Sequence, residues 1–292
     1  MTQANRDNSL QPQNKRSTST LRGIGRAAVV ALYDELALAP KPGLVSFVDS
    51  GSHDDMDART FLRSLFSLRR YFPCLAGLGA AGSTFAALER EGIAAEARML
   101  AATGGINTHR GSIFCLGLLC ASAGSLVARG AAMEATALRG ELLGCWGHAL
   151  SERAVRGSSA AHGAVAARRF GLRSAGAEAM LGFPVLFETT LPALLAAARR
   201  GAPPREARLQ AVFETMAVLE DTNLAHRGGL AGLRHAQRAA RAFLAAGGAR
   251  RPDALAHAGA VHADFVARRL SPGGTADMLA AACWAQRVCA QS

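Results

Sequence analysis

The chain has 292 residues, of which half are hydrophobic and 5% aromatic, and it carries a formal net charge of +11. This alanine- and leucine-rich composition favours helices that pack closely through small side chains. The arginines are scattered along the predicted helices and form no runs, which speaks against a dense nucleic-acid-binding stripe. A basic balance remains compatible with a polyanionic small substrate.

The N-terminal region is polar and lacks the apolar centre of a secretory signal. We expect residues 1–20 to form a disordered tail and residues 21–292 to form a single helical catalytic domain. The six cysteines contain no C-x-x-C pair and no zinc-ligand spacing. We therefore expect reduced, buried thiols in a cytoplasmic protein.

In chain order, apolar residues recur at helical spacing over residues 21–39 and stop before PKPG, which ends the helix. A second helix is predicted to begin near Asp57 and to bend or end at Pro73. One or two helices follow over residues 83–103 and end at two glycines. The uncharged segment 112–128 is slightly short for a membrane span, so we expect a buried central helix.

Helical patterns cover the rest of the chain. They lie over residues 132–155, 159–170, 185–200, 203–220, 229–246, 252–269 and 275–289. No run alternates with period two strongly enough to predict a strand, and no repeat of fixed length is found. The sequence thus predicts an all-α, single-domain multi-helix bundle.

Polar motifs rich in glycine stand at the predicted helix ends. They are PKPGLV, GSHDDMD, GGINTHRG, AHG, GFP, DTNLAHRGG and SPGGTADML. Helix N-termini present free N–H groups that suit phosphate, and glycine lets the backbone approach a ligand closely. We therefore predict that several of these junctions meet in one cleft that forms the active site.

The aspartates of HDDMD have two interpretations. They are either first-turn acids favoured by the helix dipole or oxygen ligands of Mg²⁺. Asp54 and Asp57 would share a helical face, so one member of the group is expected to be a bystander. Asp221 is a second metal or acid/base candidate, against the alternative of a helix C-terminal turn. Asp277, after a Thr275 cap, is interpreted as ordinary helix-start chemistry.

Three further positions carry cations or amides suited to a nucleotide. Lys41 is one of two lysines in an arginine-rich chain, which suggests a need for a compact ammonium group. Asn107 is either a helix cap or a ligand contact. His109 and Arg110, among glycines, favour phosphate or base recognition.

Taken in order, these motifs resemble those of the triphosphoribosyl-dephospho-CoA synthases that serve citrate lyase and malonate decarboxylase. The resemblance runs from about Glu35 to Ala281. VSFVDSGSH (45–53) is closer to the malonate decarboxylase branch. Arg110 stands where the family often has lysine, and residues 171–184 depart from its tighter Gly-Arg-Gly-Glu pattern, which leaves the roles of Arg173 and Glu178 open.

The resemblance implies an all-α enzyme that joins ATP to 3′-dephospho-CoA and releases adenine. The 2′-hydroxyl of dephospho-CoA attacks C1″ of the ATP ribose with inversion, while the triphosphate stays intact. The product, 2′-(5″-triphosphoribosyl)-3′-dephospho-CoA, is then attached to an acyl carrier protein by a separate transferase. A transition state with oxocarbenium character needs a carboxylate, and the attacking hydroxyl needs a base.

We assign roles on that chemistry. The expected phosphate-binding groups are Lys41, His53, Arg110, Arg227 and the backbone amides of Gly273 and Gly274. The carboxylates expected to share Mg²⁺ coordination with base or oxocarbenium duties are Asp55, Asp57 and Asp221. Asn107 and the catalytic His109 are expected to orient ribose or adenine.

Two other functions remain as alternatives. A Mg²⁺-dependent hydrolase of ADP-ribose-type N-glycosides would use the same carboxylates with water as the acceptor. A basic nucleic-acid-binding protein would show salt-sensitive binding that does not depend on the aspartates. We expect neither nucleic acid nor membrane as a partner, and a homodimer is one option for the oligomeric state.

Overall fold

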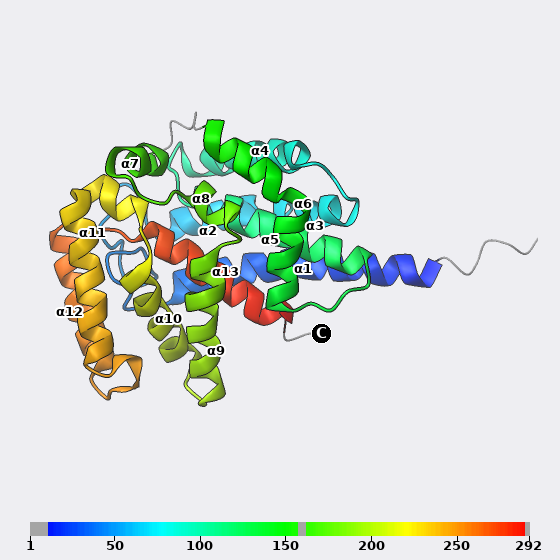
Figure 1. Ribbon diagram of the computed structural model, residues 1–292. Coiled ribbons are helices and arrows are strands. Elements are labelled where there is room, and N and C mark those ends of the chain that lie inside the picture. The colour runs from blue at the N-terminus through cyan, green and yellow to red at the C-terminus, as the bar shows by residue number, and fades with distance from the viewer. Residues whose placement is uncertain (1–10, 157–161, 290–292) are drawn as a thin grey trace, which may run out of the picture.

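The computed structural model describes residues 11–156 and 162–289, which are helical apart from their connections (Figure 1). The helices are α1 (Gln11–Ala37), α2 (Ala58–Ser67), α3 (Tyr71–Ala80), α4 (Phe85–Thr103), α5 (Arg110–Ala128), α6 (Ala135–Arg156), α7 (His162–Phe170), α8 (Ala175–Met180), the π-helical turn η1 (Leu186–Thr190), α9 (Leu191–Arg199), α10 (Pro204–Val218), α11 (Thr222–Ala245), the 3₁₀ turn η2 (Gly248–Arg250), α12 (Ala254–Ala267) and α13 (Gly273–Cys289). No strand occurs among these residues, so the all-α prediction is confirmed.

The central helix is α5, which packs against α1, α3, α4, α6 and α13. Its crossing with α3 brings the two backbones into direct contact. A Cβ atom at Gly79 would lie 1.9 Å from the carbonyl oxygen of Ala121, and one at Gly124 would lie 1.9 Å from that of Ala76. Small side chains therefore set the distance between these helices, as the composition suggested.

Within the described residues, α5 is also the one helix long and apolar enough to cross a membrane. It lies inside the protein, with 78% of the apolar window buried. The prediction of a buried central helix is confirmed. Burial on all sides removes the need for an amphipathic pattern, which explains the run without charges.

Predicted helix boundaries differ from the structure in three places. The first helix begins at Gln11, ten residues before its predicted start at Leu21, and residues 1–10 lie outside the described part of the chain. Pro73 lies in the first turn of α3, where its missing N–H costs nothing. The predicted helix start at 229 agrees with a break at Gly229, whose φ is 62°, but the helical segment that precedes it from Thr222 was not predicted.

The cysteine prediction holds in part. Cys115, Cys120 and Cys283 are buried, whereas Cys74 and Cys145 are exposed. All six are free thiols. In helices this apolar, cysteine occurs on both faces, so sequence context alone does not decide burial.

Candidate active site

A cavity of 1680 Å³ opens where the predicted junctions meet. Its wall includes eight of the eleven predicted site residues, namely His53, Asp55, Asn107, His109, Arg110, Arg227, Gly273 and Gly274. Lys41, Asp57 and Asp221 are not part of the wall. The prediction of one shared cleft is confirmed, but three of the charged groups assigned to it are used elsewhere.

Arg227 and His53 lie together on the cavity wall, where hydrogen bonds hold both side chains in place. We call this pair the arginine corner. Arg227 Nη1 donates to the carbonyl oxygens of Ser52 (3.0 Å) and Arg269 (3.2 Å), and Nη2 lies 3.0 Å from His53 Nδ1. His53 Nε2 lies 2.9 Å from Ser271 Oγ. Because a guanidinium only donates, His53 Nδ1 accepts and the imidazole is neutral. Burial lowers the pKa of His53, and the charge of Arg227 lowers it further.

Arg110 and Asn107 stand at the start of α5. The guanidinium of Arg110 binds Glu96 of α4, with Nε 2.7 Å from Oε1. Asn107 Oδ1 accepts the Arg110 backbone N–H at 3.2 Å, so the capping interpretation of Asn107 is observed. Both residues also face the cavity, which leaves ligand contact open to them.

Lys41 is buried away from the cavity wall. Its ammonium group binds the Glu35 carboxylate and also donates to the Glu35 carbonyl oxygen at 2.7 Å. Burial raises the pKa of Glu35 and lowers the pKa of Lys41, while each charge opposes the shift of the other. Glu35 lines the cavity, so Lys41 serves as the counter-ion of a cavity carboxylate, which no sequence pattern indicated.

Asp57 is the N-cap of α2. Its Oδ1 accepts the backbone N–H and the hydroxyl of Thr60, both at 2.8 Å. These hydrogen bonds lower the pKa of Asp57, whose side chain is exposed. The first-turn interpretation of this aspartate is the one that the structure supports.

We expect Asp57→Asn to keep kcat within about twofold of the wild type, because asparagine caps helices about as well as aspartate. Steady-state kinetics with ATP and dephospho-CoA measure this directly. Loss of turnover by orders of magnitude in a normally folded variant would instead make Asp57 a metal ligand or base.

Asp221 joins two helix N-termini. As the N-cap of α11, its Oδ1 accepts from the backbone N–H groups of Asn223 (3.0 Å) and Leu224 (3.4 Å). Its Oδ2 accepts from Thr275 in α13, with 2.9 Å to the backbone nitrogen and 3.3 Å to the hydroxyl. Burial raises the pKa of Asp221, and these backbone donors oppose the shift. Both oxygens are occupied, so Asp221 acts as a joint between α11 and α13.

The predicted phosphate-binding amides of Gly273 and Gly274 face partners within the protein. Gly273 N–H donates to the Ser271 carbonyl oxygen at 3.0 Å, and the Gly274 N–H helps to oppose the rise in the pKa of Asp221. The lack of a side chain at these glycines lets Asn223 and Asp221 pack closely against the start of α13. A Cβ at Gly273 would lie 2.6 Å from Asn223 Nδ2, and one at Gly274 would lie 3.2 Å from the Asp221 carboxylate.

Asp277 is the cavity carboxylate that the sequence interpretation missed. Its Oδ1 accepts from Ser112 Oγ at 2.5 Å, and a Cβ at Gly111 would lie only 1.9 Å from its Oδ2. Burial raises the pKa of Asp277 to about 7, and the charges of Glu35 and Asp221 add to the rise. The available signal was an acid near the start of α13, together with a glycine in the first turn of α5.

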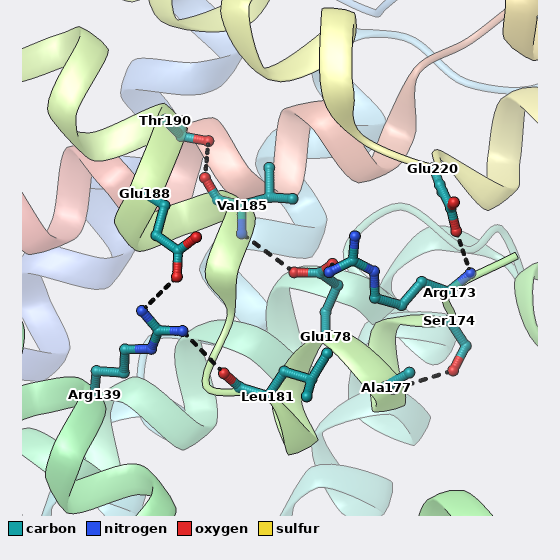
Figure 2. A network of polar contacts seen from close by, with 10 residues as sticks. All are labelled: Arg139, Arg173, Ser174, Ala177, Glu178, Leu181, Val185, Glu188, Thr190 and Glu220. Carbon is teal, nitrogen blue, oxygen red and sulfur yellow. Dashed lines mark hydrogen bonds and ion pairs between the residues drawn. The ribbon is translucent and has the colours of Figure 1, made fainter.

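Arg173 and Glu178, whose roles the sequence left open, belong to a polar network shown in Figure 2. Arg173 Nη1 lies 3.1 Å from Glu178 Oε1, and the Arg173 backbone N–H donates to Glu220 Oε2 at 2.5 Å. Glu178 Oε2 accepts the Val185 N–H at 3.4 Å. The network ties the segments on either side of α8 to the end of α10, which is a structural role.

The predicted shared Mg²⁺ site is not assembled. Asp57 and Asp221 cap helices, and only Asp55 of the three predicted ligands lines the cavity. Across residues 11–156 and 162–289, no group of three or more His, Cys, Asp or Glu side chains is arranged to hold a metal ion. The three aspartates predicted as shared ligands are therefore not gathered at one place in this part of the chain.

Fold and cavity together define an all-α protein that presents arginines, the buried carboxylate of Glu35 and the partly buried carboxylate of Asp277 to one large ligand site. The chain belongs to the CitG family, ATP:dephospho-CoA triphosphoribosyl transferase, whose model matches residues 21–292. The resemblance inferred from the motifs is confirmed, and the chain is a transferase.

Two relatives carry the name "Probable 2-(5''-triphosphoribosyl)-3'-dephosphocoenzyme-A synthase". The protein of Stutzerimonas stutzeri (strain A1501) is 38% identical over 282 residues, covering 94% of each chain. The protein of Acinetobacter calcoaceticus is 37% identical over 254 residues, covering 86% of each chain. No solved structure matches the chain.

Proposed function

We propose that the protein transfers the 5-triphosphoribosyl group of ATP to the 2′-hydroxyl of 3′-dephospho-CoA and releases adenine. The observation that carries this proposal is the single cavity, which brings an arginine corner and the carboxylates of Glu35 and Asp277 to one ligand site. A triphosphate needs cationic groups such as the arginine, and displacement at a sugar carbon needs carboxylates.

Arg227 is the best candidate for the triphosphate. Its guanidinium donates to carbonyl oxygens and to a neutral imidazole, and no carboxylate of the described residues forms a hydrogen bond with it, although the charges of Asp55 and Asp54 act on it from further away. Arg110 and Arg153 also line the cavity but bind Glu96 and Glu89. Three anchored partners hold Arg227 in place before ATP binds, which reduces the entropy lost on binding.

Asp277 is the best candidate for the base that takes the proton of the 2′-hydroxyl. A base works best when its pKa lies near the operating pH, and burial brings the pKa of Asp277 to about 7. Glu35, with Lys41 behind it, would place a second carboxylate near the positive charge that develops on the ribose. These two groups take the duties first assigned to Asp57 and Asp221.

Mg²⁺ in this proposal arrives as part of the substrate MgATP. The ion prefers six oxygen ligands and usually keeps several waters, so triphosphate oxygens and water can supply most of its shell. Asp55 is the one predicted ligand on the cavity wall, where it lies 3.6 Å from His53 Nδ1. The protein's contribution to the ion would then be small.

The product would serve as the prosthetic-group precursor of malonate decarboxylase and not of citrate lyase. The support is the segment VSFVDSGSH (45–53), which is closer to that branch. A separate transferase would attach the product to an acyl carrier protein. We place these steps in the cytoplasm.

The test is mass spectrometry of the products formed from ATP, Mg²⁺ and dephospho-CoA, together with an adenine assay. We expect one adenine for each triphosphoribosyl-dephospho-CoA, and no adenine without dephospho-CoA. Adenine released at the same rate without the acceptor would support the N-glycoside hydrolase alternative and contradict the transferase.

A further inference from the structure

His109 has an imidazole nitrogen without a hydrogen-bond partner among the described residues. The side chain is 3% exposed and lies on the cavity wall, yet Nε2 is buried and makes no hydrogen bond. An unpaired buried donor or acceptor costs roughly 1–3 kcal/mol. Native proteins rarely keep such a group unless a ligand or water satisfies it.

The hydrogen bond at Nδ1 determines whether Nε2 of the neutral ring carries a proton. Thr108 Oγ1 donates to Ser64 Oγ at 2.7 Å, and Ser64 Oγ lies 2.6 Å from His109 Nδ1. Ser64 Oγ accepts the proton of Thr108, and among the described residues His109 Nδ1 is the acceptor within reach of the proton of Ser64. We therefore assign Nδ1 as the acceptor, because the buried hydroxyl would otherwise leave its proton unpaired. The remaining proton of the neutral ring is therefore on Nε2, and Nε2 is a donor.

The ring is neutral and fixed in orientation. Burial lowers the pKa of His109 to about 3, and the charge of Lys41 adds to the shift. The Phe61 ring, also on the cavity wall, contacts the imidazole edge-on, with centroids 5.0 Å apart at 74°. A single neutral donor beside an aromatic ring does not neutralise a phosphate, but it suits the acceptor nitrogens of a planar base.

We propose that His109 Nε2–H donates a hydrogen bond to N3 or N7 of the adenine of ATP, the acceptor nitrogens nearest the bond that breaks, and stabilises adenine as it leaves. This inference rests on the proposed function. In the displacement, the 2′-oxygen of dephospho-CoA forms a bond to C1″ and gives its proton to Asp277. The electron pair of the C1″–N9 bond goes to adenine, which takes one proton from water and leaves neutral, while Asp277 returns its proton to water.

His109 keeps its own proton throughout this step. Its hydrogen bond is weak to neutral adenine in ATP and strengthens as negative charge develops on the departing ring. An interaction that strengthens in the transition state raises kcat with little effect on KM. That pattern separates catalysis by His109 from a merely structural role.

The experiment measures kcat and KM of the full chain with ATP, 3-deaza-ATP and 7-deaza-ATP, each analogue lacking one acceptor nitrogen. For His109→Ala with ATP, we expect kcat to fall about 10²- to 10³-fold and KM to change by less than about threefold. One of the two analogues should slow the wild type more than it slows His109→Ala, because the variant has no bond to lose.

The matched control is His148→Ala, which removes an exposed histidine paired with Glu152 outside the cavity, and it should keep kcat within about twofold. His109→Gln retains an N–H donor and should recover part of the lost kcat. If His109→Ala does not fold, judged by circular dichroism, His109→Gln takes its place in the analogue comparison.

The inference is overturned if His109→Ala turns over ATP at the wild-type rate, or if both analogues slow the wild type and the variant by equal factors. In either case the wild type still forms product, so the proposed function stands. A wild type that forms no product from ATP and dephospho-CoA would instead refute the proposed function.

Discussion

Asp277→Asn should lower kcat by about 10²- to 10⁴-fold, the range expected for loss of a general base. The amide occupies the same space beside Ser112 but cannot take the hydroxyl proton. The matched control is Asp253→Asn, which changes an exposed aspartate at the start of α12 and should leave turnover within about twofold.

The pH profile gives a second readout. A base must be deprotonated to act, and burial raises the pKa of Asp277 to about 7. The wild-type kcat/KM should therefore fall about tenfold per pH unit below pH 7, and this limb should be missing in Asp277→Asn. An unchanged limb in the variant would show that another group is the base.

The same substitution should stabilise the fold at high pH. The folded-state pKa of Asp277 lies above the ordinary value of 3.8, so the folded protein binds this proton more tightly than the unfolded chain. Wild-type stability is then lost as pH rises from about 4 to about 7. At pH 8 we expect Asp277→Asn to unfold at higher urea, with a gain on the order of 2 kcal/mol.

Asp221→Ala should destabilise the protein by about 3 kcal/mol or more, because a helix cap and charge-assisted hydrogen bonds to two helices are lost together. Asp221→Asn should cost less but still destabilise, since its NH₂ group would face a backbone donor of α11 or α13. Urea unfolding at pH 7 measures both.

Asp253→Ala is the control for this effect. Asp253 also stands at a helix N-cap, but its side chain makes no capping hydrogen bond and it is exposed. We expect a loss below about 0.5 kcal/mol. Wild-type stability in Asp221→Ala, together with lost turnover, would return Asp221 to the metal-ligand role first assigned to it.

The contrast between Asp221 and Asp277 shows where interpretation of the sequence succeeds and where it fails. Asp221 and Asp277 both stand in glycine-rich motifs at helix starts, and both motifs line the cavity. The sequence favoured Asp221 as the chemical group and dismissed Asp277 as a first-turn acid. The structure reverses the assignment, because Asp221 has no free oxygen, whereas Asp277 lies on the cavity wall.

Local patterns by themselves determined the helices, the buried α5 and the position of the polar motifs at helix ends. Apolar periodicity and glycine positions act within a few residues, so they can be read along the chain. The same holds for the family, because its motifs are contiguous.

Only the tertiary structure decided which polar groups remain free for a substrate. That depends on partners far away in the chain: Asp221 binds Thr275 across 54 positions, and Ser112 binds Asp277 across 165. A carboxylate or ammonium group that is fully hydrogen-bonded by such partners has little capacity left for a ligand. Asp221, held by Thr275, is the clearest case.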